Sequence, residues 1–300
     1  MTQAAGVTPS ELKATQMKSE PREAWISLAT VSVLIRKELR DAVHNRWFVS
    51  YTAGFTVMAL GVSYMAQLGT GYSGFAGFGP TAASMINLVL LLVPLMALTL
   101  GSSSLALERD RGMLAYVLAQ PVNRVEVILA KFLGLAIALL GALAAGFGAA
   151  ALLIARQADA QQVGLFLRLI GFSAMLALSM LAVGMMIATF IRSSGAATGA
   201  ALLAWLTFLL LGDLGLMGSA VMFRIQTPEL FLTAIINPTE CFRLSVIGGF
   251  DATLDVLGPA GLYASNTFGP RLPVLLAVVL VTWTLVPLML AVFRFSRKPL

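Results

Sequence analysis

The residues best suited to contact another protein lie in one charged segment, residues 107–131, between two long apolar runs. Its candidate contact residues are Glu108, Arg109, Asp110, Arg111, Gly112, Pro121 and Arg124. Carboxylates and guanidinium groups placed this closely make charge-assisted hydrogen bonds, which suit the docking of a partner. A solvated charged loop is the alternative, and the internal order of the segment favours a docking surface.

This segment is predicted to fold as a helix, a turn and a second helix lying flat on one membrane surface. Residues 113–120 have apolar side chains at helical spacing, which predicts a short helix with one apolar stripe. Pro121 ends it, because the residue before a proline avoids helical geometry. Asn123 can then cap the next helix, and Glu126 three residues later completes a capping box.

A second candidate cluster lies in the loop between the fifth and sixth apolar runs, residues 218–272. Its members are Asn237, Pro238, Glu240, Phe242 and Arg243. Asn237 is predicted to be an N-cap, with Pro238 at the first helical position and Glu240 at the third. The stretch therefore predicts a pair of short helices that either contact a partner or only shape the mouth of the molecule.

A third candidate, residues 31–47, is an amphipathic helix. Arg36, Lys37, Arg40 and His44 share one face at 100° per residue, and apolar side chains occupy the other. Such a helix lies in the membrane interface with its cations toward anionic headgroups. It serves either as an anchor or as a lever that moves with a partner, and the sequence favours the anchor.

No catalytic set and no metal site is predicted in this chain. One histidine, His44, and one cysteine, Cys241, leave little for acid–base or thiolate chemistry. No Gly-Lys dipeptide occurs, so the phosphate-binding loop of ATPases is absent and no cofactor is expected to bind here. Methionines such as Met175, Met180 and Met185 could ligate copper, but packing between helices is the favoured interpretation.

The elements that must position these residues are membrane helices. The 300 residues are 58% hydrophobic and 11% charged, with a mean hydropathy of +0.88, which excludes disordered, coiled-coil and nucleic-acid-binding classes. Runs of about 20 apolar residues predict an all-α integral membrane protein with six spans. The spans are Phe48–Ala66, Ser84–Leu107, Phe132–Ala155, Leu169–Ile191, Ala197–Met217 and Pro273–Phe293.

The distribution of charge predicts the orientation of the chain. Most of the 20 Lys and Arg residues fall on the side of the N-terminus when six spans are assumed, which places both termini in the cytoplasm. Residues 1–30 are polar and are expected to be a disordered cytoplasmic leader, followed by the interfacial helix 31–47 and a six-span membrane domain, 48–298.

The charged segment resembles the coupling segment of type-two ABC exporter permeases. The resemblance is carried by Glu108, Arg109, Gly112, Leu118, Pro121, Arg124 and Lys131. It implies that residues 107–131, with a cytoplasmic coupling helix, dock on a dimer of ABC ATPases, which bind ATP and Mg²⁺. It also implies a homodimer, and the small residues Gly141, Ala145 and Ala149 would permit close helix approach within the chain or between copies.

Two further stretches resemble NosY-type permeases, which serve the maturation of nitrous oxide reductase. They are residues 36–47, with the sequence RKELRDAVHNRW, and the residues around Asn237-Pro238-Thr239. This resemblance implies a periplasmic copper-handling β-helix protein as a further partner, and the inner (plasma) membrane of a bacterium as the location. A general ABC exporter of lipid, drug or peptide is the alternative within this class. An ATP-independent channel or carrier and a simple ATPase anchor are alternatives from other classes.

Overall fold

The computed structural model describes residues 28–69, 78–113, 122–154, 160–222, 227–248, 263–264 and 266–297, and no strand occurs among them. The long helices are α2 (Leu28–His44), α3 (Arg46–Gly69), α4 (Phe78–Asp110), α6 (Arg124–Ile154), α7 (Ala160–Phe190), α8 (Ser194–Met222) and α12 (Leu272–Arg297). Two short helices, α9 (Thr227–Ile236) and α10 (Pro238–Ile247), and the 3₁₀ turn η2 (Gly269–Arg271) complete the set. The all-α prediction is confirmed.

The six predicted spans are confirmed as six helices long and apolar enough to cross a membrane. The helices extend beyond the apolar runs. The third begins at Arg124 instead of Phe132, and the fourth begins at Ala160 instead of Leu169. Polar residues at the membrane boundary continue a helix as readily as apolar ones do, so hydropathy alone places the ends too far inward.

Some predicted features fall outside the described residues. They include the leader up to residue 27, the short helix expected in residues 114–120, and Pro121. Residues 28–30 already belong to α2, so the amphipathic helix begins three residues earlier than the pattern indicated.

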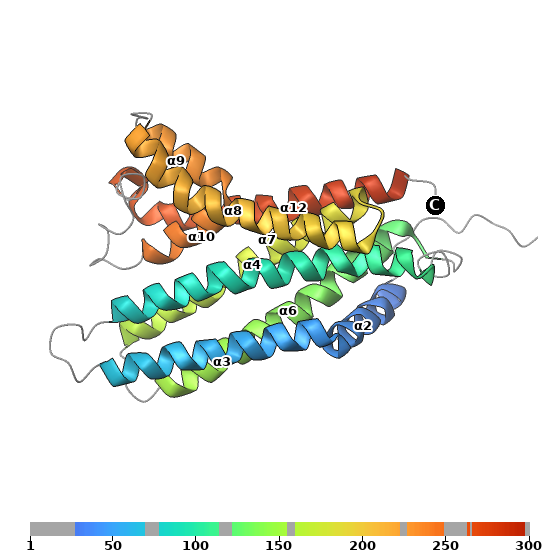
Figure 1. Ribbon diagram of the computed structural model, residues 1–300, viewed down its shortest axis with the longest axis horizontal. Coiled ribbons are helices and arrows are strands. Elements are labelled where there is room, and N and C mark those ends of the chain that lie inside the picture. Colours follow the sequence, from blue (N-terminus) through green and yellow to red (C-terminus); the bar gives the residue numbers. More distant parts are fainter. Residues whose placement is uncertain are drawn as a thin grey trace, which may run out of the picture.

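The long helices lie side by side along the longest axis of the molecule (Figure 1). The amphipathic helix α2 and the C-terminal end of α12 lie at one end, which we call the α2 end. The short helices α9 and α10 lie at the opposite end, the α9–α10 end. The two predicted clusters of functional residues are therefore at opposite ends of the bundle.

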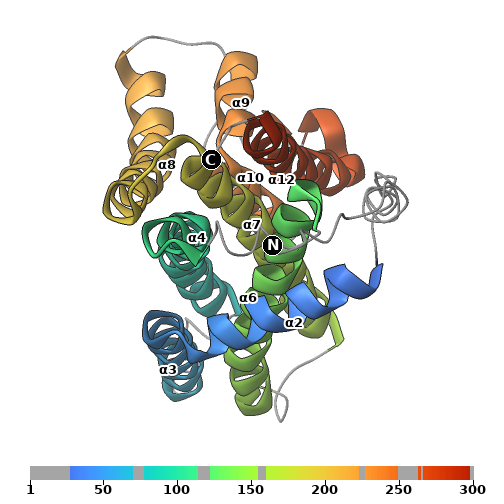
Figure 2. The same cartoon turned by 90° about the vertical axis from the view of Figure 1, so that its right-hand side faces the viewer.

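Three helices form the centre of the bundle and three lie at its periphery. In α4, α6 and α7, 61–67% of the spanning residues are buried, against 17–28% in α3, α8 and α12. Figure 2 shows α7 at the centre, with α4, α6 and α12 around it. The outer helices thus present most of their apolar surface to the surroundings of the single chain.

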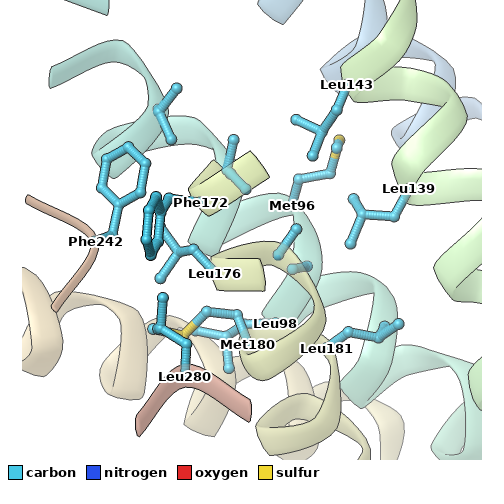
Figure 3. Close-up of a cluster of buried hydrophobic side chains, with 14 of the residues drawn as sticks. Met96, Leu98, Leu139, Leu143, Phe172, Leu176, Met180, Leu181, Phe242 and Leu280 are labelled. Carbon is cyan, nitrogen blue, oxygen red and sulfur yellow. The ribbon is translucent and has the colours of Figure 1, made fainter. Parts of the chain in front are cut away.

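The core is built around α7 (Figure 3). Phe172 and Leu176 of α7 lie against Phe242 of α10, while Met180 lies between Leu98 of α4 and Leu280 of α12. All of these side chains are buried. Met180 belongs to this hydrophobic cluster, in agreement with the packing role favoured for the methionines.

Two glycines, Gly101 of α4 and Gly184 of α7, make a close helix crossing. A Cβ on Gly101 would lie 2.6 Å from the carbonyl oxygen of Leu181, and one on Gly184 would lie 2.6 Å from that of Leu98. Hydrogen in place of a side chain lets the two backbones touch. By contrast, Gly141, in the small-residue stripe of the third span, faces nothing within 4 Å in the single chain.

Candidate functional site

Four charged side chains from three helices meet at the α2 end, and we call them the four-charge cluster. Lys131 of α6 places its Nζ 2.7 Å from Glu38 Oε2 of α2 and 3.1 Å from Glu108 Oε2 of α4. Lys37 Nζ lies 2.9 Å from Glu108 Oε1 and 3.1 Å from Glu38 Oε1. Each lysine contacts both glutamates, and Lys37 also lies 3.5 Å from Asp41 Oδ2. Opposite charges thus join α2, α4 and α6 at one point.

The four-charge cluster is shielded from solvent to different degrees. The side chain of Lys131 is 2% exposed and that of Glu38 is 9% exposed, whereas that of Lys37 is 36% exposed. A buried charge is tolerated only when it is paired, so the three helices cannot separate here without exposing or isolating a charge. Burial alone lowers the pKa of Lys37, but the hydrogen bond to Glu108 and the charges of both glutamates outweigh it and raise the pKa above its ordinary value.

The structure changes the interpretation of the amphipathic helix. Arg36, Arg40 and His44 are exposed as expected, but Lys37, assigned to the same face, is half-buried and turns toward the glutamates. Glu38 lies on the buried face, where a Cβ on Gly134 of α6 would be only 2.6 Å from the Glu38 Cβ. The missing side chain at Gly134 lets α2 lie directly on α6.

The next two residues of the charged segment bind the junction between α7 and α8. Arg109 Nη1 donates to the carbonyl oxygens of Ala188, at 3.2 Å, and Ile191, at 2.9 Å, at the C-terminal end of α7. The amide of Ser194, the first residue of α8, donates to Asp110 Oδ2 at 2.8 Å. A cation at a helix C-terminus and an anion at a helix N-terminus both complement the helix dipole. Residues 108–110 therefore contact α2, α6, α7 and α8.

The remaining residues of the predicted coupling segment flank the residues that the structure does not describe. Arg111 and Gly112 are exposed, and Gly112 has a φ of 71°, a conformation that favours glycine. On the other side, Val125 N donates to Asn123 Oδ1 and Asn123 N donates to Glu126 Oε2, which confirms the predicted capping box. Arg124 Nη1 lies 3.5 Å from the carbonyl oxygen of Phe295 in α12.

At the opposite end, Asn237 joins α10 to α8. Asn237 Oδ1 accepts from the amide of Thr239 at 3.0 Å, which confirms it as the N-cap of α10. Asn237 Nδ2 donates to the carbonyl oxygen of Phe208 in α8 at 2.7 Å. The Thr239 hydroxyl lies 2.7 Å from Asn237 Oδ1 and 3.3 Å from the same Phe208 oxygen, and it shares its proton between these two acceptors. The cap and the contact between the helices use the two ends of one amide side chain.

The other residues predicted at this end are mostly buried. Glu240 Oε1 lies 3.1 Å from Arg243 Nη1, and its carboxylate fills the space where a Cβ on Gly212 of α8 would stand. Pro238 is buried, and Phe242 is fully buried in the core. These side chains hold α10 in place instead of forming an exposed docking surface.

Sequence reasoning identified the residues at both ends but missed how they pair. It placed Lys131 in the charged segment without a partner, and it did not single out the carbonyl oxygen of Phe208. The available signal for the four-charge cluster was Glu38, an acid on the otherwise apolar face of α2. Among the described residues, no group of three or more His, Cys, Asp or Glu is arranged to hold a metal ion.

Comparison with known proteins agrees with this architecture. The model of the ABC-2 family transporter proteins matches residues 32–300. The probable ABC transporter permease protein NosY of Stutzerimonas stutzeri is 32% identical over 274 residues, which cover 88% of this chain and 97% of that protein. NosY of Pseudomonas aeruginosa is 31% identical over 279 residues, which cover 91% of this chain and 100% of that protein.

Proposed function

The chain belongs to the ABC-2 family of transporter proteins, and we propose that this ABC transporter permease subunit converts ATP hydrolysis on a separate ATPase into movement at its α9–α10 end. The observation that carries the proposal is the set of contacts made by residues 108–110. Three consecutive side chains bind α2, α6, α7 and α8. A force on the adjoining residues would reach four helices through short polar contacts.

The ATPase surface would dock on residues 107–131, with Arg111 and Gly112 exposed beside it. The ATPase dimer would bind ATP and Mg²⁺, and this chain would bind no cofactor. When the ATPase dimer closes, the end of α4 would shift, and the four-charge cluster would carry α2 and α6 with it. In this mechanism α2 is a moving part as well as an anchor, because Glu38 and Lys37 fix it to the coupling end.

The proposed orientation places the α2 end in the cytoplasm of a bacterium and the α9–α10 end in the periplasm, with the spans in the inner membrane. Exposed cations at the α2 end, including Arg36, Arg40 and Arg297, agree with the positive-inside rule. The functional unit would be a homodimer with two ATPase subunits, and the poorly buried surfaces of α3, α8 and α12 leave room for a second copy.

The biological setting we propose is the assembly of the copper sites of nitrous oxide reductase. Support comes from the two NosY relatives, each matched over most of its length. The resemblance around residues 36–47 and 237–239 supports the same setting. A periplasmic copper-handling β-helix protein would then be the partner at the α9–α10 end. The permease would change the affinity of that partner for copper, or it would move a small sulfur-containing species outward.

The first test is purification of the native complex, in nanodiscs, followed by a labelling assay. Glu229 is exposed on α9, so Glu229→Cys offers a maleimide site at the α9–α10 end. The native chain, whose cysteine is buried, gives the background. We expect an ATPase to co-purify and the labelling rate at residue 229 to change when ATP is added. The proposed function would be refuted if no ATPase co-purified, or if the labelling rate at residue 229 did not change on addition of ATP.

Two variants test the docking residues in the same assay. Gly112→Ala strains the turn at φ 71° without filling a packed space, at a cost of about 1–2 kcal/mol. Glu108→Lys reverses a charge that two lysines contact. Both are expected to remain inserted and to lose the effect of ATP on labelling. Gly195→Ala is the matched control, because Gly195 also faces open space but has no positive φ. Retention of the ATP effect in both variants would show that the docking site lies elsewhere.

A further inference from the structure

We propose that α8 carries the movement of the α2 end to the α9–α10 end, with Asp110 and Asn237 as the positioning residues at the first and last of its three points of attachment. This inference rests on the proposed function, because it names the path by which the ATPase would act on the far end. It assigns one mechanical role to residues that the sequence placed in two separate clusters.

The first attachment is at the start of α8. Asp110, the last residue of α4, accepts a hydrogen bond from the amide of Ser194, the first residue of α8, at 2.8 Å. Arg109 holds the end of the preceding helix through the carbonyl oxygens of Ala188 and Ile191. A side chain of α4 thus adds an acceptor to the first turn of α8, whose own preceding residue Ser193 accepts from the amide of Ala196 at 3.4 Å. Any shift of residue 110 pulls directly on the first turn of α8.

The second attachment is near the middle of α8, where Trp205 Nε1 donates to the carbonyl oxygen of Leu91 at 3.1 Å. Leu91 also belongs to α4, and α8 makes most of its contacts with that helix. The two helices run antiparallel and are held together at two levels. This contact keeps α8 aligned with α4, so that a movement of α8 would follow the axis of α4.

The third attachment connects α8 to the α9–α10 end. The carbonyl oxygen of Phe208 accepts hydrogen bonds from Asn237 and Thr239, and Gly212 one turn later receives the Glu240 carboxylate. Ser194 and Phe208 are 14 residues apart, about 21 Å along a helix axis. An intact α-helix over that distance transmits displacement without a chain of flexible side chains.

Within the single chain, α8 lies at the periphery of the bundle. Only 17% of its spanning residues are buried, the smallest share of the six spans. The alternative route runs through α7 and α12, which pack against α10 through the buried core around Phe242. That route requires displacement of tightly packed side chains, whereas the α8 route requires a shift of one peripheral helix and a few polar contacts.

The relay is tested by removing one attachment at a time in the Glu229→Cys complex. Asp110→Ala removes the acceptor at the start of α8. Asn237→Ser with Thr239→Val removes both bonds to Phe208, while serine retains the capping oxygen of α10. Thr207→Val is the matched control, because within the described part of the chain the Thr207 hydroxyl bonds only the carbonyl oxygen of Leu203 in its own helix.

We expect the ATP-dependent difference in labelling rate to fall by about fivefold or more in either variant, the lower end of measured coupling between sites. ATP hydrolysis and insertion should persist, and Thr207→Val should behave as the parent. Combining the variants at both ends should reduce the difference no further, because both interrupt one path.

A full ATP response in the Asn237/Thr239 variant would overturn the relay and leave the proposed function standing. A parent complex that does not respond to ATP would overturn both. If Asp110→Ala fails to insert, the Asn237/Thr239 variant still decides the question.

Discussion

Lys131 Nζ lies 2.7 Å from Glu38 Oε2, although the two residues are 93 positions apart in the chain and belong to different helices. Both side chains are shielded from solvent. This bond fixes the amphipathic helix α2 to the third span, and Glu108 extends it to the coupling end of α4. The position of an interfacial helix is thus determined by a protein contact as well as by the membrane.

Replacement of Lys131 with methionine is expected to destabilise the protein by about 3–5 kcal/mol, because it leaves buried carboxylates without one of their cations. Methionine preserves much of the apolar stem, so the loss reports mainly on charge. Thermal unfolding of the purified protein in nanodiscs measures it.

The double variant Lys131→Met with Glu38→Leu is the control for that prediction. It removes one positive and one negative charge together and leaves Lys37 paired with Glu108. We expect it to be clearly more stable than Lys131→Met alone. Equal destabilisation of the single and double variants would contradict the ion-pair explanation and point to packing.

Gly101→Ala is expected to weaken the crossing of α4 and α7, because the added methyl group meets backbone atoms that cannot move aside. Overpacking of this kind costs about 1–3 kcal/mol. Gly141→Ala places the same methyl group in open space on another spanning helix and should leave the melting temperature of the single chain nearly unchanged. A comparison of the two melting temperatures checks the prediction, which fails if they are alike.

The sequence alone predicted the number of spans and the N-caps of α6 and α10. Hydropathy and capping both depend on residues that are close together in the chain. Asn123, Glu126 and Asn237 act within one turn of the helices they cap. The pairing of Lys131 with Glu38, and that of Gly101 with Gly184, depends on how helices cross, and no local pattern encodes that. The sequence pointed instead to Gly141, because spacing alone cannot identify which face of a helix meets another.

The same reason explains why the clusters at the two ends were assigned exposed roles. Charged and polar residues in loops are normally at the surface. Here Glu240 and Phe242 lie on the side of α10 that packs against the bundle, and Lys37 is drawn inward by two acids. Tertiary contacts, not residue type, decide which of these groups can reach a partner.

Cys241 provides a test that depends on pH. Burial, together with the charge of Glu240, raises the pKa of its thiol to about 12, whereas the thiol of the unfolded chain ionises near a pKa of about 8.5. The folded state therefore holds the proton more tightly, and stability that is complete below about pH 8.5 is lost above it at up to about 1.4 kcal/mol per pH unit. The difference in unfolding free energy between the native chain and Cys241→Ala should shift in favour of the variant between pH 8 and pH 9.5. An unchanged difference would mean that the thiol ionises equally in both states.

Gly212 of α8 tests the packing of the α9–α10 end from the side of the spanning helix. Its missing side chain makes room for the Glu240 carboxylate, which also pairs with Arg243 at 3.1 Å. In Gly212→Ala the Glu240 carboxylate has to move, which disturbs either its ion pair with Arg243 or the packing of α10 against α8. We expect a loss of about 1–3 kcal/mol of stability and faster maleimide labelling at residue 229 without ATP.

Gly199→Ala is the control, because Gly199 lies on the same helix with nothing within 4 Å of the added methyl group. Since alanine favours a helix over glycine by about 0.8–1 kcal/mol, Gly199→Ala should be neutral or stabilising. Two glycines of one helix would then respond in opposite directions, and the sign at Gly212 would follow from the Glu240 side chain alone.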